Sequence, residues 1–237
     1  MIPDVLMFLP GFHDYYWLTH SRRGILTACL PLGVGFFLLF ELLAKRPLID
    51  LAPEPICRRL HGHFAPTIRP TFGFFFSIAV ATLIGAMSHV LWDSFTHEGR
   101  RDVRLVPVLD TEWFTLLGIT FTGISTLQHF SSVVFLPILL GGVIWWLWQQ
   151  DDRHDIPENP LSDSQRWFCL ATLFLLPPLL ALVSVYSNMG WPRDQGSFAQ
   201  FAGWSAKTAI GGVLLVCGIY CIAYQTLSKV DPVRDTA

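Results

Sequence analysis

The stretch TFGFFFSIAVATLIGAMSHVLWDSFTHEG, residues 71–99, decides the fold of this chain. It begins with an apolar run of the ~20 residues that an α-helix needs to cross the ~30 Å hydrocarbon core of a bilayer. It ends with His89, Asp93 and His97 spaced four residues apart. Positions four apart lie nearly above one another on a helix, so the three side chains form one stripe at the end of a predicted membrane span.

The stripe carries the chemistry of a metal site. Ionisable side chains inside a membrane are costly and are functional by default, and imidazole with carboxylate suits zinc, iron or manganese. Because the stripe is about 12 Å long, it either serves two ions, or His89 and Asp93 share one ion with ligands from elsewhere. The alternative is structural polar packing at the helix end.

The composition is that of a membrane protein. Of the 237 residues, 52% are hydrophobic and 14% are charged, whereas a soluble domain carries about 25% charged residues. The net charge of −2 gives no indication of a nucleic-acid partner. The lipid bilayer is therefore the expected partner, and the oligomeric state stays open.

Four further apolar runs complete an all-α, polytopic transmembrane bundle of about five spanning helices in a single membrane domain, 1–237. The predicted spans are 24–44, 71–92, 126–148, 167–187 and 206–227. We expect a loop over 45–70 with a short helix near 54–63, and a solvated linker over 149–166. In the region 100–123, VRLVPVL favours an extended segment and TEWFTLLGITFTG favours a half-helix lying against the bundle.

Connectivity places several ionisable residues at one membrane face. With five spans, the start of the first, the end of the second and the start of the third lie on the same side. These places carry His20, the stripe of His89, Asp93 and His97, and His129. We expect their side chains to converge.

The N-terminal residues 1–20 are apolar but broken by Pro10–Gly11. We expect residues 4–9 to form a short interfacial helix that tucks under the bundle with Asp4 towards the histidines. The alternative is an ordinary interfacial anchor with Asp4 in water.

Five motifs occur in a characteristic order: PD (3–4), TH-S-R-R-G (19–24), KRPLIDLAP (45–53), SHVLWDSFTHEG (88–99) and LQHFSS (127–132). In these motifs the chain resembles the bacterial multi-pass membrane proteins grouped as domain of unknown function 4184, over roughly residues 1–150. The remainder, 151–237, is a linker with two further spans. A looser likeness runs to the predicted membrane-bound metal-dependent hydrolases, which carry PD, TH-S and SH-x3-D in that order.

The resemblance implies a multi-pass protein of the bacterial inner membrane and a site built from Asp4, His20, His89, Asp93, His97 and His129. We expect metal ligation by Asp4, His20, His89 and Asp93, with His97 or Glu98 as base or further ligand and His129 as ligand or oxyanion stabiliser. Family members usually carry an additional helix with a Ser-His pair before the Pro-Asp dipeptide, which implies a further ligand upstream of Met1.

The favoured function is a metal-dependent hydrolase that uses zinc, manganese or iron on a lipid-like substrate, such as a phosphoester, at the membrane face. The rival is a non-enzymatic membrane protein, either an ion or proton pathway or a structural subunit. A pathway needs polar residues across the whole bilayer. Apart from Lys207 at the start of the fifth, the fourth and fifth predicted spans carry no carboxylate, histidine or basic side chain and only a few serine, threonine, glutamine, tyrosine and cysteine side chains, which favours the enzyme.

Overall fold

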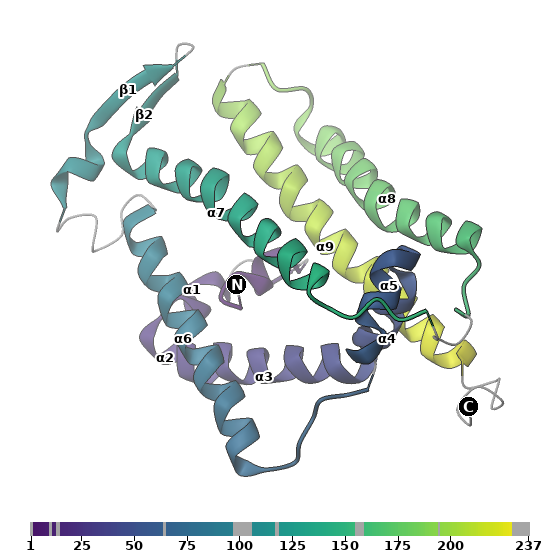
Figure 1. Ribbon diagram of the computed structural model, residues 1–237. Coiled ribbons are helices and arrows are strands. Elements are labelled where there is room, and N and C mark those ends of the chain that lie inside the picture. The colour runs from purple at the N-terminus through teal and green to yellow at the C-terminus, as the bar shows by residue number, and fades with distance from the viewer. Residues whose placement is uncertain are drawn as a thin grey trace.

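The computed structural model describes residues 2–9, 11–12, 15–63, 65–96, 106–116, 119–154, 159–193 and 195–228. Within this part, five helices are long and apolar enough to cross a membrane (Figure 1). They are Arg22–Leu51, α6 (Phe72–Thr96), α7 (Gly123–Trp148), α8 (Asp163–Met189) and Gln200–Leu227 within α9 (Gln195–Ser228). The predicted all-α polytopic fold is confirmed, and the arrangement indicates an integral membrane protein.

The first span is one continuous helix that contains two π-helical turns. Its parts are α2 (Arg22–Gly24), η3 (Ile25–Cys29), α3 (Leu30–Leu39), η4 (Phe40–Ala44) and α4 (Lys45–Leu51), of which η3 and η4 are π-helical. The loop expected from residue 45 therefore begins only after Leu51. The short helix expected near 54–63 is confirmed as α5 (Glu54–Leu60) and η5 (His61–His63).

A buried ion pair explains why the first helix continues past its predicted end. Lys45 Nζ donates to both carboxylate oxygens of Glu41, one turn earlier, at 3.2 and 3.0 Å. It also donates to the Ala65 carbonyl at 3.1 Å, and the Thr67 backbone N–H donates to Glu41 at 2.7 Å. The charge of Lys45, which predicts a helix end in the sequence, is thus neutralised by Glu41 inside the helix. The contacts of the pair with residues 65 and 67 also hold the following loop against the helix.

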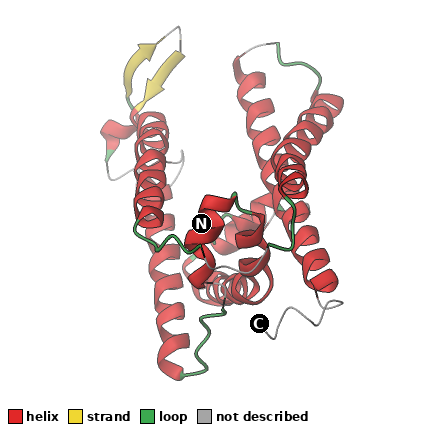
Figure 2. Cartoon of the chain, turned by 45° about the vertical axis from the view of Figure 1, so that its right-hand side comes forward, coloured by secondary structure: helices red, strands yellow, loops and turns green. Residues whose placement is uncertain are grey.

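The helices approach closely where small residues meet. A Cβ at Gly33 in α3 would lie 2.3 Å from Thr82 Cγ2 in α6, and one at Gly212 in α9 would lie 2.9 Å from Pro177 Cβ in α8. Glycine lets helix backbones come together in this way in membranes. Figure 2 shows α8 and α9 side by side, apart from the column formed by α6 and α7.

The KRPLIDLAP motif joins the far end of the first span to α9. Tyr220 Oη donates to the Pro47 carbonyl at 3.0 Å, and Tyr224 Oη donates to the buried Asp50 carboxylate. Asn159 adds a hydrogen bond to the Asp50 carbonyl at 3.0 Å. This end of the bundle is therefore held by polar contacts between three separate segments.

The half-helix expected over 111–123 is wrong, because the segment forms a β-hairpin. Strands β1 (Glu112–Leu116) and β2 (Ile119–Thr122) pair antiparallel, with Phe114 stacked on Phe121 at 5.1 Å. Aromatic and β-branched side chains favour such pairing. The preceding VRLVPVL segment is also not simply extended, since η7 (Pro107–Asp110) forms a 3₁₀ turn within its described part.

The segment expected as a solvated linker over 149–166 is partly bound to α5. Arg58 Nε lies 3.3 Å from Asp152 Oδ1, and Arg59 donates to the Gln150 carbonyl at 2.9 Å. Helix α8 already begins at Asp163, behind a capping box in which Ser162 and Gln165 bond each other's backbone N–H groups.

Candidate metal site

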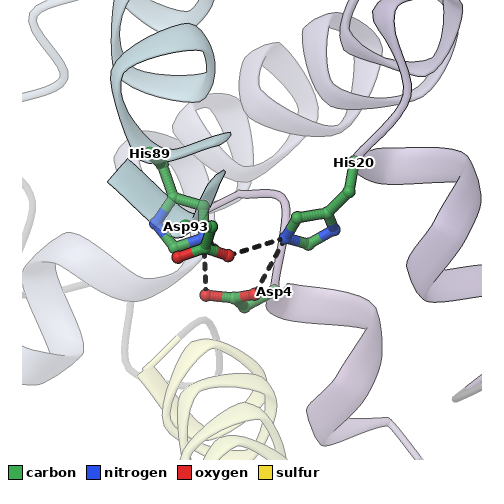
Figure 3. A group of neighbouring side chains, drawn as sticks. All are labelled: Asp4, His20, His89 and Asp93. Carbon is green, nitrogen blue, oxygen red and sulfur yellow. Dashed lines mark ion pairs between the residues drawn. The ribbon is translucent and has the colours of Figure 1, made fainter. Parts of the chain in front are cut away.

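Four ionisable side chains from three segments meet at one place: Asp4, His20, His89 and Asp93 (Figure 3). One potential ligand atom from each lies within 4.8 Å of all the others. His20 Nε2 is 3.4 Å from Asp4 Oδ1 and 3.3 Å from Asp93 Oδ2. His89 Nε2 is 2.9 Å from Asp4 Oδ2 and 3.4 Å from Asp93 Oδ2. The group is the size of a single-ion site.

Helix α6 supplies His89 and Asp93 from one face. The two residues are one turn apart, and Asp93 lies three positions before the end of the helix at Thr96. Asp93 is buried and His89 is half-buried. Of the alternatives left open for the stripe, the structure favours the one in which these two residues share an ion with ligands from elsewhere.

The TH-S-R-R-G motif places His20 directly before the first span. His20 follows α1 (Tyr16–Thr19), and the Ser21 side chain caps the next helix by accepting from the Gly24 N–H at 2.9 Å. A Cβ at Gly24 would lie 1.5 Å from the Leu18 carbonyl oxygen. Glycine is therefore required for the sharp turn that points His20 inward while the helix starts beside it.

The N-terminal segment supplies Asp4. The short helix expected over residues 4–9 with Asp4 towards the histidines is confirmed: η1 (Val5–Phe8) is a 3₁₀ turn preceded by Asp4. Thr19 Oγ1 donates to the Pro3 carbonyl at 2.7 Å, which fixes the chain next to Asp4. The segment also lies against α9, since a Cβ at Gly211 would be 2.2 Å from the Phe8 carbonyl oxygen.

The hydrogen bonding of His20 prepares it as a ligand. Its Nδ1 lies 2.9 Å from the Tyr16 carbonyl, which can only accept, so Nδ1 carries a proton. In the neutral ring Nε2 then presents its lone pair to the group, the arrangement usual for metal-binding histidines. The Nε2 atoms of His20 and His89 are both buried and neither makes a hydrogen bond of acceptable geometry. Two such nitrogens facing two carboxylates fit a divalent cation.

Without an ion, the opposite charges of the group stabilise each other. Burial alone would lower the pKa of His20, but the carboxylates of Asp4 and Asp93 and the Tyr16 carbonyl outweigh it and raise the pKa to about 9. Burial alone would raise the pKa of Asp4, yet the two histidines hold it well below its usual range. A metal ion must therefore displace a proton from His20 over most of the neutral pH range.

The metal-free protein is expected to lose stability as pH rises. The pKa of His20 is raised in the folded state, from 6.5 to about 9. Its contribution is therefore complete below pH 6.5 and disappears as pH passes about 9. Thermal unfolding of chelator-treated protein, followed by tryptophan fluorescence, should show a midpoint several degrees lower above this window than below it. His20→Gln should flatten the profile, and an unchanged wild-type midpoint would contradict the assignment.

Of the other sequence-predicted residues, the structure describes only His129, which is not in this group. His129 lies exposed on α7, where its Nδ1 donates to the Ser125 carbonyl at 2.6 Å and its ring packs edge-on to Phe121. We expected His129 to converge with His20, His89 and Asp93, but it lies outside the group that these residues form with Asp4. The catalytic role of His129 stays a prediction. His97 and Glu98 lie outside the described residues.

Sequence reasoning missed the residues that position the ligands. Thr19 is fully buried and links the N-terminal segment to the first span, and the Tyr16 carbonyl orients His20. Thr19 directly precedes His20 in the TH-S motif, and this position next to a candidate ligand is the feature of the sequence that could have identified it. The Tyr16 contact uses only backbone and leaves no mark in the sequence.

The comparisons with known proteins agree with the motif order. The family described as Domain of unknown function (DUF4184) matches residues 1–223, which extends beyond residue 150 through α8 and into α9. No curated protein and no solved structure matches the chain. Because the match covers nearly the whole sequence, the chain belongs to the DUF4184 family.

Proposed function

We propose that the protein is a membrane-bound metal-dependent hydrolase whose ion is held by Asp4, His20, His89 and Asp93. The observation that supports this most is the cluster itself: one potential ligand atom from each of the four side chains lies within 4.8 Å of the others, and both histidine Nε2 atoms are buried facing the two carboxylates. An ion at this place accounts for both nitrogens and neutralises both carboxylates.

The donor set constrains the ion. Two imidazoles and two carboxylates suit zinc, manganese or iron. Four protein ligands fill a tetrahedral zinc sphere, whereas hydrolysis needs an open position. Five- or six-coordinate binding of one of these ions keeps that position. The bound ion would then lower the pKa of a water molecule and polarise a phosphoryl or acyl oxygen.

The chain's own residues divide the remaining tasks. The Tyr16 carbonyl holds the His20 ring, and Thr19 holds the segment that carries Asp4. His97 or Glu98, four and five positions after Asp93, is the proposed proton acceptor, with His129 as a second group near the start of α7. The location near the end of α6 supports a lipid-like substrate, such as a phosphoester, reached from a bacterial inner membrane.

An ion or proton pathway is less well supported. Residues 25–40 of the first span contain no ionisable side chain except Cys29, over about 24 Å of helix. The buried charges beyond them, Glu41 and Lys45, are paired with each other. The group of Asp4, His20, His89 and Asp93 is therefore separated from Glu41 and Lys45 by a largely apolar stretch of the first span.

Hydrolysis in detergent micelles tests the proposal. Metal-depleted protein is reloaded with zinc, manganese or iron and assayed on a chromogenic phosphodiester and a fluorogenic acyl ester. Asp93→Asn is expected to reduce the metal-dependent rate more than about 100-fold, since even outer partners of ligands contribute 10–100-fold. Asp163→Asn, an exposed aspartate at the start of α8, is the matched control. Equal rates in wild type and Asp93→Asn would refute the assignment.

A further inference from the structure

An apolar groove of about 500 Å³ lies between the first span and α6. One end is formed by Ile2 and Ala86, and Ile2 is two positions before Asp4. From there the groove follows α6 back to Phe74, with Phe37 of α3 on the other wall. The groove therefore begins beside the four-residue group and runs away from it along the helix.

The groove and the candidate metal site share one face of α6. The groove-lining positions 74, 77, 78, 81, 82, 85 and 86 follow the three- and four-residue spacing of a single helix face. The same spacing leads on to His89 and Asp93. A molecule lying in the groove thus has one end within about one turn of helix of His89 and two turns of Asp93.

The dimensions of the groove match a lipid chain. Positions 74 to 85 cover about 16 Å of helix, which is close to half of the ~30 Å hydrocarbon core, the depth of one leaflet. The far end is lined by Phe37 and Phe74, whose rings are edge-on with centroids 5.9 Å apart. Beside it α3 and α6 approach closely, since a Cβ at Gly33 would lie 2.3 Å from Cγ2 of the groove-lining Thr82. A linear chain with a polar end at the metal site fits this shape.

We propose that the groove binds one acyl chain of a lipid whose polar end lies at Asp4, His20, His89 and Asp93. The role of that polar end as the substrate's reacting group rests on the proposed hydrolase function, whereas chain binding does not. Gly85 lines the groove, and a Cβ at this position would meet nothing within 4 Å. A larger side chain here is therefore expected to extend into the groove.

Photocrosslinking with labelled palmitate tests the groove and its direction. Two probes are used in detergent micelles, one with a diazirine near the carboxylate and one with a diazirine near the methyl end, and crosslinked peptides are mapped by mass spectrometry. The first probe should label the Ile2–Ala86 end and the second the Phe37–Phe74 end. Gly85→Leu should reduce both labels about tenfold, the effect of removing about two methylene groups from the groove.

Gly141→Leu is the matched control, because Gly141 lies within α7 and a Cβ there also meets nothing within 4 Å. It should leave the labelling unchanged. Labelling spread evenly over α6 and α7, or without preference between the two probes, would overturn the proposal. Metal content is measured in parallel. Position-specific labelling of a protein that binds no metal would support the groove and refute the hydrolase. Uniform labelling of a protein that does bind metal would refute the groove and leave the metal site of the proposed hydrolase standing.

Discussion

Purified Asp93→Ala protein is expected to contain no zinc, manganese or iron under conditions in which the wild-type protein contains close to one ion per chain. Asp93 Oδ2 lies 3.3 Å from His20 Nε2 and 3.4 Å from His89 Nε2, so a single carboxylate oxygen faces both imidazoles. Removing one of four ligands leaves an incomplete sphere that cannot compete with water for the ion. His89→Ala and His20→Ala should have the same effect. Elemental analysis after size-exclusion chromatography measures it.

Histidines elsewhere serve as controls for this loss. His154 lies exposed and contacts Arg58 at 3.0 Å, and His61 is the first residue of η5, directly after α5. His61→Ala and His154→Ala should retain the full metal content. His129→Ala should also retain it, because His129 is not among the grouped residues. Equal metal content in wild type and Asp93→Ala would show that the four side chains do not form an ion site.

Glu41→Ala is expected to destabilise the protein by about 3–5 kcal/mol, the usual cost of leaving one partner of a buried ion pair uncompensated. The Glu41 and Lys45 side chains are only 7% and 8% exposed. Without Glu41, the Lys45 ammonium keeps only the Ala65 carbonyl among the described contacts, and the Thr67 N–H loses its acceptor. Unfolding from mixed micelles by increasing SDS, followed by tryptophan fluorescence, measures the change.

Glu54→Ala is the matched control, since Glu54 forms the same i,i+4 type of pair with Arg58 but is 61% exposed. Exposed pairs contribute about 0–1 kcal/mol. The double variant Glu41→Leu/Lys45→Met should regain most of the lost stability, because it removes both charges together. A Glu41→Ala effect no larger than that of Glu54→Ala would contradict the buried-pair interpretation.

The membrane spans were predictable because twenty-residue apolar runs need no knowledge of packing. Two features escaped this reasoning. The first helix extends to Leu51 because Lys45 finds Glu41 and the Ala65 carbonyl, which hydropathy does not register. The hairpin β1–β2 depends on pairing between neighbouring strands, whereas its sequence allowed a helix equally well.

The candidate site was partly predictable for a similar reason. Connectivity fixes which membrane face a residue occupies, and this was sufficient for His20, His89 and Asp93. It does not fix the rotation of a helix about its axis, where each residue turns the side chain by about 100°. His129 has the expected place along α7 but points elsewhere, towards Phe121.

The four candidate ligands come from three segments that are far apart in the sequence, so an ion bound between them would also have a role in assembly. An ion held by Asp4 and Asp93 would close a long loop and cross-link the N-terminal half of the chain, much as a disulfide does in a secreted protein. Ligand binding to the folded state alone stabilises it by about 2.7 kcal/mol at a hundredfold excess over Kd. Metal supply would then add to the contacts that already hold the N-terminal segment, the Thr19–Pro3 hydrogen bond and the packing of Phe8 against Gly211, so metal-depleted protein is expected to lose this segment to protease faster than metal-loaded protein.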